Sequence, residues 1–280
     1  MGKRKKKRGL SITRIIFVFN IVAVLTLLLY FAKPIRKYAL RAYRYYMIQE
    51  DKAVFEKTGF PAGYKVHGID ISHYQTKVDW DNLKSVSKLG DTISYQFVVV
   101  KATEGTWLED ELFEKHWKNA TKKKIIKGAY HYYHPNKSND QQARNFIESV
   151  SLGRGDLPPV IDIEESKKMT KREIVKSLKD FIKLLENHYH VKPIIYSNRN
   201  FIEDYLSDDF DNYIFWVAHY ERPSIVFNDV KWMFWQHNDK ARLLNGQQID
   251  ANVFNGTKSD LRKITIGGKQ VEFKQGSKSE

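Results

Sequence analysis

The chain has 280 residues and carries 47 Lys and Arg against 33 Asp and Glu, a formal net charge of +14. The surplus lies at the ends: residues 1–50 hold 12 basic residues and 1 acid, residues 257–280 hold 6 and 3, and residues 51–256 hold 29 of each sign. The charge balance therefore gives no support to a nucleic-acid-binding body, and we expect no nucleic-acid partner. The absence of cysteine excludes disulfides, thiolate metal sites and a cysteine nucleophile.

The N-terminus has the pattern of a membrane anchor. Residues 3–8 form an unbroken basic cluster, and residues 15–32 contain no charged side chain. A helix of that length spans about 27 Å, close to the hydrocarbon thickness of about 30 Å. A cleavable signal peptide is the alternative, but no small-residue cleavage pattern follows the apolar run. We predict a cytoplasmic segment (1–14) and a transmembrane helix (15–32), a single pass that places the body outside the cell membrane because the denser basic cluster precedes it.

The remaining chain divides into three parts. Residues 33–63 mix Tyr, Ala, Lys and Arg with little turn chemistry, which is typical of a juxtamembrane stalk, and the stretch 59–63 breaks this pattern with Gly and Pro. Residues 64–256 form the predicted body, which we expect to be monomeric. Residues 257–280 form a basic C-terminal tail.

Short apolar runs in the body alternate with longer amphipathic runs. In chain order we predict strands at Val66–Ile71, Phe97–Lys101, Gly128–Tyr133, Val160–Ile163, Ile194–Tyr196, Tyr213–Ala218, Trp232–Trp235 and Gln248–Asn252. We predict helices at Trp80–Leu89, Asp110–Lys123, Asn139–Val150, Lys171–His188 and Arg199–Leu206, with Thr170 and either Asn139 or Asp140 as N-caps. This alternation predicts an α/β fold with a parallel sheet, and eight strands indicate a closed, TIM-like β/α barrel.

Polar residues gather where the predicted strands end. They are Asp70, Lys101 with Glu104, Tyr132 with His134, Asp162 with Glu164, Tyr196, Trp216 with His219, Gln236 and Asp250. A β/α barrel builds its active site from the C-terminal ends of its strands. We therefore expect these side chains to converge on one cleft.

Asp162 and Glu164 follow a buried-type strand and are two residues apart. Residues at that spacing in a strand face the same side, with α-carbons about 7 Å apart. Two neighbouring carboxylates cannot both ionise easily, so one pKa rises, as a general acid in glycoside hydrolysis requires.

Other chemistries find less support in the sequence. A carboxylate-only Mg²⁺ or Ca²⁺ site remains an alternative for the acids, although the nine His residues show no zinc-ligand spacing on a helix. Neither a phosphate-binding glycine loop nor a serine nucleophile elbow occurs. We expect no metal and no cofactor.

Aromatic residues also cluster at or near the strand ends: Tyr74, Trp107, Tyr130, Tyr132, Tyr133, Tyr196, Trp216, Tyr220, Trp232 and Trp235. Sugar rings stack their C–H faces on aromatic rings, while sugar hydroxyls bond to polar tips. Many of these rings fill a barrel core in any case. Only those at the strand ends are therefore interpreted as ligand contacts.

Several motifs resemble glycoside hydrolase family 25, the lysozyme-type muramidases. They are Gly68-Ile69-Asp70-Ile71-Ser72-His73-Tyr74-Gln75 with Val78-Asp79-Trp80, Val100-Lys101-Ala102-Thr103-Glu104-Gly105, Gly128-Ala129-Tyr130-His131-Tyr132, Asp162-Ile163-Glu164, Ile195-Tyr196-Ser197, Trp216-Val217-Ala218-His219-Tyr220, Trp235-Gln236 and Asp250-Ala251-Asn252-Val253-Phe254. The resemblance covers about residues 65–256.

The resemblance implies a barrel of about five β/α units and three further strands. It also implies cleavage of the β-1,4 bond between N-acetylmuramic acid and N-acetylglucosamine in the glycan strands of peptidoglycan. By analogy Glu164 is the proton donor, Asp162 steers the substrate's acetamido group or acts as the base, and Asp70 and Asp250 shape the cleft. The predicted substrate-binding residues are Tyr74, Lys101, Glu104, Tyr132, Tyr196, Trp216 and Gln236. A catalytically silent wall-binding module and a chitinase-like hydrolase on the same barrel are the alternatives.

Overall fold

The structure is a computed structural model that describes residues 38, 39, 43, 45, 46, 49–220, 222 and 232–268. The chain splits into two compact units, residues 1–50 and residues 51–280. The predicted cytoplasmic segment and transmembrane helix lie outside the described residues. Within the described part of the chain, no helix combines the length and apolar character that a membrane crossing needs.

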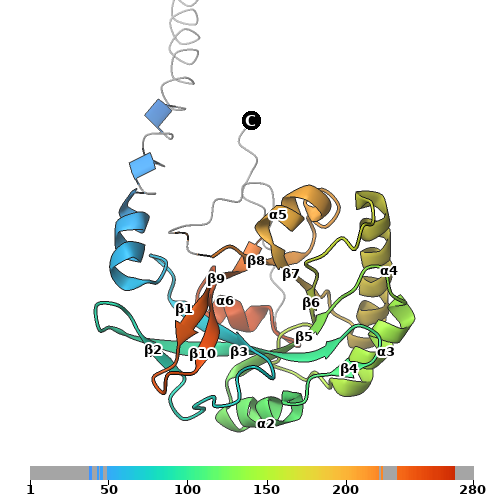
Figure 1. Ribbon diagram of the computed structural model, residues 1–280, viewed down its shortest axis with the longest axis horizontal. Coiled ribbons are helices and arrows are strands. Elements are labelled where there is room, and N and C mark those ends of the chain that lie inside the picture. Colours follow the sequence, from blue (N-terminus) through green and yellow to red (C-terminus); the bar gives the residue numbers. More distant parts are fainter. Residues whose placement is uncertain are drawn as a thin grey trace, which may run out of the picture. The chain divides into compact units, whose positions relative to one another are not determined.

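Eight strands of the second unit form a closed barrel, which confirms the predicted barrel (Figure 1). They are β1 (Val66–Ile71), β3 (Thr92–Glu104), β5 (Ile126–Tyr132), β6 (Val160–Asp162), β7 (Ile194–Asn198), β8 (Ile214–Ala218), β9 (Trp232–Arg242) and β10 (Gln248–Phe254). The order around the barrel is β1-β10-β9-β8-β7-β6-β5-β3, and pairing of β3 with β1 closes it. Neighbouring strands run parallel except at β10, which is antiparallel to both β1 and β9.

Helices follow four of the strands and lie outside the ring (Figure 1). They are α2 (Phe113–Lys123), α3 (Asn139–Ser149), α4 (Lys171–Tyr189) and α5 (Arg199–Phe201), which continues as a π-helix over Ile202–Leu206. Thr170 caps α4 in a reciprocal capping box with Glu173, as its position predicts. At α3 the cap is Ser138 rather than Asn139 or Asp140.

The predicted helix at Trp80–Leu89 is wrong. Residues Lys84–Val86 form strand β2, which pairs antiparallel with the first residues of β3, and Gly90 turns between them at a φ of +91°. The apolar residues of this segment have helix-like spacing, but Ser85 is buried and its hydroxyl donates to the carbonyl oxygen of Arg242. Hairpin pairing satisfies the backbone here, so the first barrel strand has no following helix and four rather than five β/α units are present in the described chain.

The core has two layers. Inside the barrel, Val66, Phe97, Leu157 and Phe254 pack with other apolar residues from the strands, and a second, larger layer fills the space between strands and helices. Gly68 of β1 faces inward, where a β-carbon would overlap the ring of Phe97. The lower part of the barrel, at the end where the parallel strands begin, is therefore filled with packed side chains.

The chain after residue 256 begins with folded structure. Leu261 of helix α6 (Lys258–Lys263) and Ile264, which follows the helix, are buried against the residues inside the barrel. The basic tail that the sequence indicates from residue 257 thus starts with a helix that covers the lower end of the barrel.

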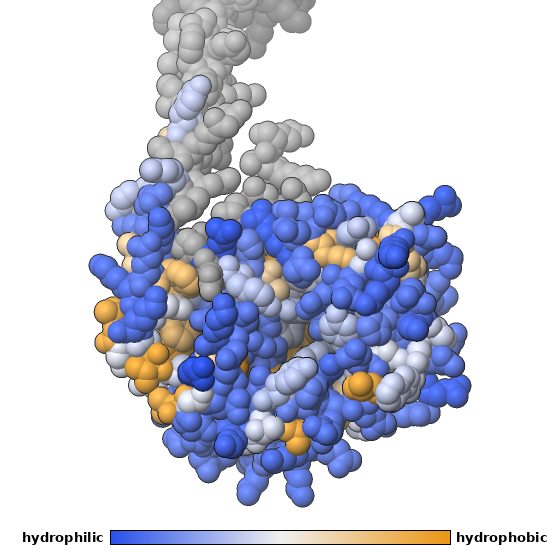
Figure 2. Space-filling model, in the orientation of Figure 1, coloured by the Kyte–Doolittle hydropathy of each residue, from blue (hydrophilic) through white to orange (hydrophobic). Residues whose placement is uncertain are grey.

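Strand β4 (Leu108–Glu109) pairs with the end of β3. The face in Figure 2 is largely hydrophilic, with hydrophobic residues in small groups only.

Candidate active site

A cavity of about 180 Å³ opens among the strand ends on the side of the barrel away from α6. It is lined by Asp70, Tyr130, Val160, Asp162, Glu164, Tyr196, Trp216, Tyr220, Gln236 and Asp250. These residues come from seven strands and from the loops that follow two of them. The four carboxylates that the sequence singled out therefore share one cavity.

Asp70 and Asp250 face each other across neighbouring strands. They are register partners between β1 and β10. The sequence places Asp250 at the C-terminal end of a strand, and this is wrong, because it lies near the start of β10. The reversed direction of β10 carries its start to the end of the barrel where the parallel strands terminate.

Asp70 accepts several hydrogen bonds in a buried position. Oδ2 accepts from Gln236 Nε2 at 2.8 Å and from Asn252 Nδ2 at 2.7 Å. Gln236 Oε1 in turn accepts from the hydroxyls of Tyr196 at 2.6 Å and Tyr220 at 2.7 Å. This network fixes the orientation of the Gln236 side-chain amide, because its oxygen accepts hydrogen bonds on one side and its nitrogen donates one on the other.

Burial raises the pKa of both members of the Asp70–Asp250 pair. The pKa of Asp70 rises to about 6 because burial outweighs the hydrogen bonds donated to it, chiefly by Asn252. The pKa of Asp250 rises to about 9 because of burial and the nearby charge of Asp70. The pair therefore retains one proton at neutral pH, held by Asp250, while Asp70 carries the charge that its amide donors stabilise.

Asp162 and Glu164 form the second acidic pair. Burial raises the pKa of Asp162 well above its ordinary value, and the charge of Glu164 adds to the effect. Burial also raises the pKa of Glu164, while a hydrogen-bonding interaction with Tyr196 lowers it. Asp162 is buried and its Oδ1 has no hydrogen-bond partner, whereas Glu164 is only half-buried. Glu164, whose pKa is raised, thus opens to the cavity beside a buried carboxyl with a free acceptor oxygen.

The sequence profile of the glycosyl hydrolases family 25 matches residues 69–245. The chain belongs to this family. It is accordingly a glycoside hydrolase, as the resemblance of its motifs predicts.

Proteins from several bacteria are similar to the chain. The uncharacterized protein YegX of Escherichia coli K12 is 39% identical over 214 residues, which cover 75% of this chain and 77% of YegX. Lysozyme M1 of Streptomyces globisporus is 30% identical, over 74% of each chain. The solved structure of a family 25 glycosyl hydrolase from Bacillus anthracis has a TM-score of 0.66 at 30% identity, over 75% of this chain and 97% of that one.

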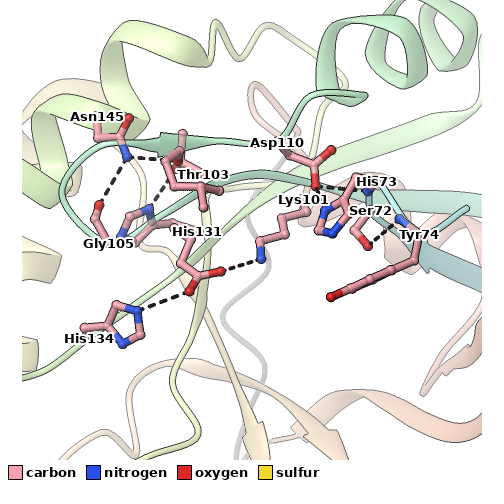
Figure 3. Close-up of polar contacts among 12 residues, drawn as sticks. Ser72, His73, Tyr74, Lys101, Thr103, Gly105, Asp110, His131, His134 and Asn145 are labelled. Carbon is pink, nitrogen blue, oxygen red and sulfur yellow. Dashed lines mark hydrogen bonds and ion pairs between the residues drawn. The ribbon is translucent and has the colours of Figure 1, made fainter.

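A polar cluster lies next to the family 25 cavity. Lys101 Nζ is 2.6 Å from Glu104 Oε2, and His134 Nε2 is 3.3 Å from Glu104 Oε1 (Figure 3). Lys101 Nζ also lies 5.5 Å from the centre of the Tyr132 ring. The charge of Lys101 lowers the pKa of Asp162 against the larger effect of burial.

The structure brings together most, but not all, of the predicted site. Asp70, Asp162, Glu164, Tyr196, Trp216, Gln236 and Asp250 line the cavity, whereas Lys101, Glu104, Tyr132 and Tyr74 lie outside its lining. Trp216 is only 2% exposed, and its indole nitrogen donates to Asn252 Oδ1 at 2.8 Å. It therefore holds Asn252 in place and offers little ring surface to a sugar. In the described chain, no group of three or more His, Asp and Glu side chains is arranged to hold a metal ion.

Three residues at the site are absent from the predicted catalytic and substrate-binding residues: Tyr130 and Tyr220, which the sequence places only in the aromatic cluster near the strand ends, and Asn252. Tyr130 is on the same face of β5 as Tyr132, and Asn252 on the same face of β10 as Asp250. Two-residue alternation from a predicted site residue would have found both. Tyr220 follows β8 in a turn, where no periodic pattern applies.

Proposed function

We propose that the protein is an N-acetylmuramidase that hydrolyses the β-1,4 bond between N-acetylmuramic acid and N-acetylglucosamine in peptidoglycan. The observation that carries the proposal is the pair of carboxyls at the end of β6, of which Glu164 opens to the cavity. Membership of family 25 and similarity to a protein named Lysozyme M1 support the choice of substrate.

Glu164 is the proposed proton donor. A general acid must be protonated near the working pH and must reach the leaving oxygen. Burial raises the pKa of Glu164, and its half-exposed position in the cavity places the proton where a bound sugar can take it. Protonation of the glycosidic oxygen weakens its bond to the anomeric carbon, the step common to glycosidases that work with paired carboxyls.

Asp162 is the proposed partner of the substrate's acetamido group. Its buried Oδ1 lacks a donor, and such a free acceptor costs free energy until a ligand supplies one. The N–H of an acetamido group is a donor of the required kind. The hydrogen bond would orient that group beside the anomeric carbon, while the single charge of the Asp70–Asp250 pair favours the positive charge that develops there.

The test is the hydrolysis of purified peptidoglycan by the full chain and by Glu164→Gln. The wild type is expected to release reducing ends of muramic acid, identified by mass spectrometry, and the variant to lose activity by at least about a hundredfold while still binding the glycan. Glu165→Gln is a matched control, because Glu165 is the same residue type next in the chain but is exposed. It is expected to keep near wild-type turnover.

Three results would redirect the proposal. Wild-type binding of peptidoglycan without any release of reducing ends would favour the silent wall-binding module. Release of glucosamine reducing ends from chitin, with none of muramic acid from peptidoglycan, would favour the chitinase-like alternative. Undiminished activity of Glu164→Gln would remove Glu164 from the mechanism.

We further propose that residues 15–32 anchor the enzyme in the cell membrane, with the catalytic body on the outer side. The support is the uncharged run and the basic cluster before it. A body tethered in this way reaches only the wall near its stalk. Fractionation of cells and protease treatment of spheroplasts test the location: the body is expected in the membrane fraction and cleavable from outside, and a body recovered in the medium or protected from protease contradicts it.

A further inference from the structure

Two aromatic side chains stand exposed at the end of the barrel that carries the cavity. Tyr74 follows β1 and is 76% exposed, and Trp107, in the turn between β3 and β4, is 79% exposed. Tryptophan is on average a well-buried residue, so an indole ring left in water loses the free energy that burial would supply. Neither ring lines the cavity that holds the acids.

The turn that carries Trp107 is held rigidly. Asn145 of α3 is buried, and its Nδ2 donates to the carbonyl oxygens of Gly105 at 3.1 Å and Leu108 at 3.2 Å (Figure 3). The backbone N–H of Gly105 donates to the carbonyl oxygen of Tyr132 at 3.0 Å. An exposed ring on a fixed turn loses little entropy when a ligand stacks on it.

The loop that carries Tyr74 is fixed by the same segment. Asp110 lies three residues after Trp107 and its side chain is fully buried. Its Oδ2 accepts from the backbone N–H of His73 at 3.0 Å and lies 2.7 Å from His73 Nδ1, while the His73 ring lies 4.0 Å from the Tyr74 ring (Figure 3). Hydrogen bonds of residues 105–110 thus fix the backbone turns that carry both aromatic side chains.

A continuous row of residues links the acids to the rim of the barrel end, by which we mean the turns that carry Tyr74 and Trp107. Asp162 is the register partner of Tyr132 on β5, and Tyr132 is the register partner of Glu104 at the end of β3. Trp107 follows Glu104 by three residues. A polymer seated at the acids can therefore run over Tyr132 and reach the rim without leaving the surface of the barrel end.

We propose that Trp107, with Tyr74, forms an outer binding subsite for sugars of the same glycan strand beyond those held at the acids. This inference rests on the proposed function, because it takes the strand to be the polymer that the site cleaves. Sugar rings offer apolar C–H faces of the kind that stack on indole and phenol rings. The outer subsite favours long strands over short fragments.

The test compares Trp107→Ala, Tyr74→Ala and the wild-type full chain on two substrates, long glycan strands and a purified tetrasaccharide of the same strands. For the wild type, KM is expected to be lower on the long strands. An aromatic contact contributes about 0.5–1.5 kcal/mol, so each variant is expected to raise KM on long strands by about two- to tenfold with kcat retained. Trp107→Phe keeps an aromatic ring. It is therefore expected to retain most of the wild-type difference in KM between long strands and the tetrasaccharide.

Leu89→Ala is the matched control. Leu89 is an exposed apolar residue in the turn between β2 and β3, at the start of β3 and thus at the far end of the barrel from the cavity. It is expected to leave both KM values unchanged. A Trp107→Ala protein with the wild-type ratio of KM values on the two substrates overturns the inference, and so does a wild type that shows no preference for long strands. Failure of the wild type to cleave either substrate would instead overturn the proposed function.

Discussion

Replacement of Asp250 by Asn should change how the stability of the protein depends on pH. The raised pKa values of Asp70 and Asp250 mean that the folded state binds more protons than the unfolded state at intermediate pH. Stability that depends on a raised pKa is fully present below the unfolded value of 3.8 and is lost as pH rises toward the folded value, about 9 for Asp250. An Asn at position 250 removes this contribution and leaves the amide donors of Asp70 in place.

The size of the effect follows from linkage. At about pH 7 the unfolded Asp250 is ionised and the folded one protonated, which costs the folded state up to about 4 kcal/mol relative to low pH. The free energy of unfolding of Asp250→Asn should therefore fall less than that of the wild type between about pH 4 and pH 7, by up to that amount. Denaturant unfolding followed by tryptophan fluorescence at a series of pH values measures the two curves.

The control is Glu148→Gln, which neutralises an exposed carboxylate on α3. Its curve is expected to run parallel to that of the wild type. If the curve of Asp250→Asn also runs parallel to the wild type over this range, the two aspartates do not share a proton in the folded state, and the assignment of charge in the cavity is refuted.

Three further changes test other parts of the structure. Tyr196→Phe removes a hydrogen bond that lowers the pKa of Glu164, so the fall of kcat/KM at high pH should move to higher pH, and a shift to lower pH would contradict the proton donor's environment. Gly68→Ala forces a β-carbon against the ring of Phe97 and should destabilise the barrel by about 1–3 kcal/mol in denaturant unfolding; unchanged stability would mean that the ring moves freely. Thr170→Ala breaks the capping box of α4 and should cost about 1 kcal/mol without changing kcat, whereas a change in kcat would tie α4 to the site.

Local patterns in the sequence were enough to find most of the barrel. Each of the eight strands contains a short apolar run, and this signal depends on residues a few positions apart. The pair Asp162 and Glu164 was found for the same reason, because two-residue spacing on a strand fixes a common face. The prediction for Trp80–Leu89 is wrong because the apolar spacing of this segment suits a helix. The segment instead pairs with the start of β3, and its own residues do not show that pairing.

Contacts between distant segments decided the rest. Asp250 reaches Asp70 across 180 positions of sequence because β10 runs antiparallel to β1, and strand direction is not written in the residues of β10 themselves. The same closure of the barrel sets Asn252 against Asp70 and buries Trp216. Trp216, an aromatic residue of the kind that binds sugars, therefore donates a hydrogen bond to the Asn252 amide instead. The sequence by itself determined which acids the protein carries and that Asp70, Asp162 and Glu164 lie at or just after strand ends. Only the tertiary structure decided which acid shares a proton with which, because pKa values depend on burial and on neighbours that the chain brings together when it folds.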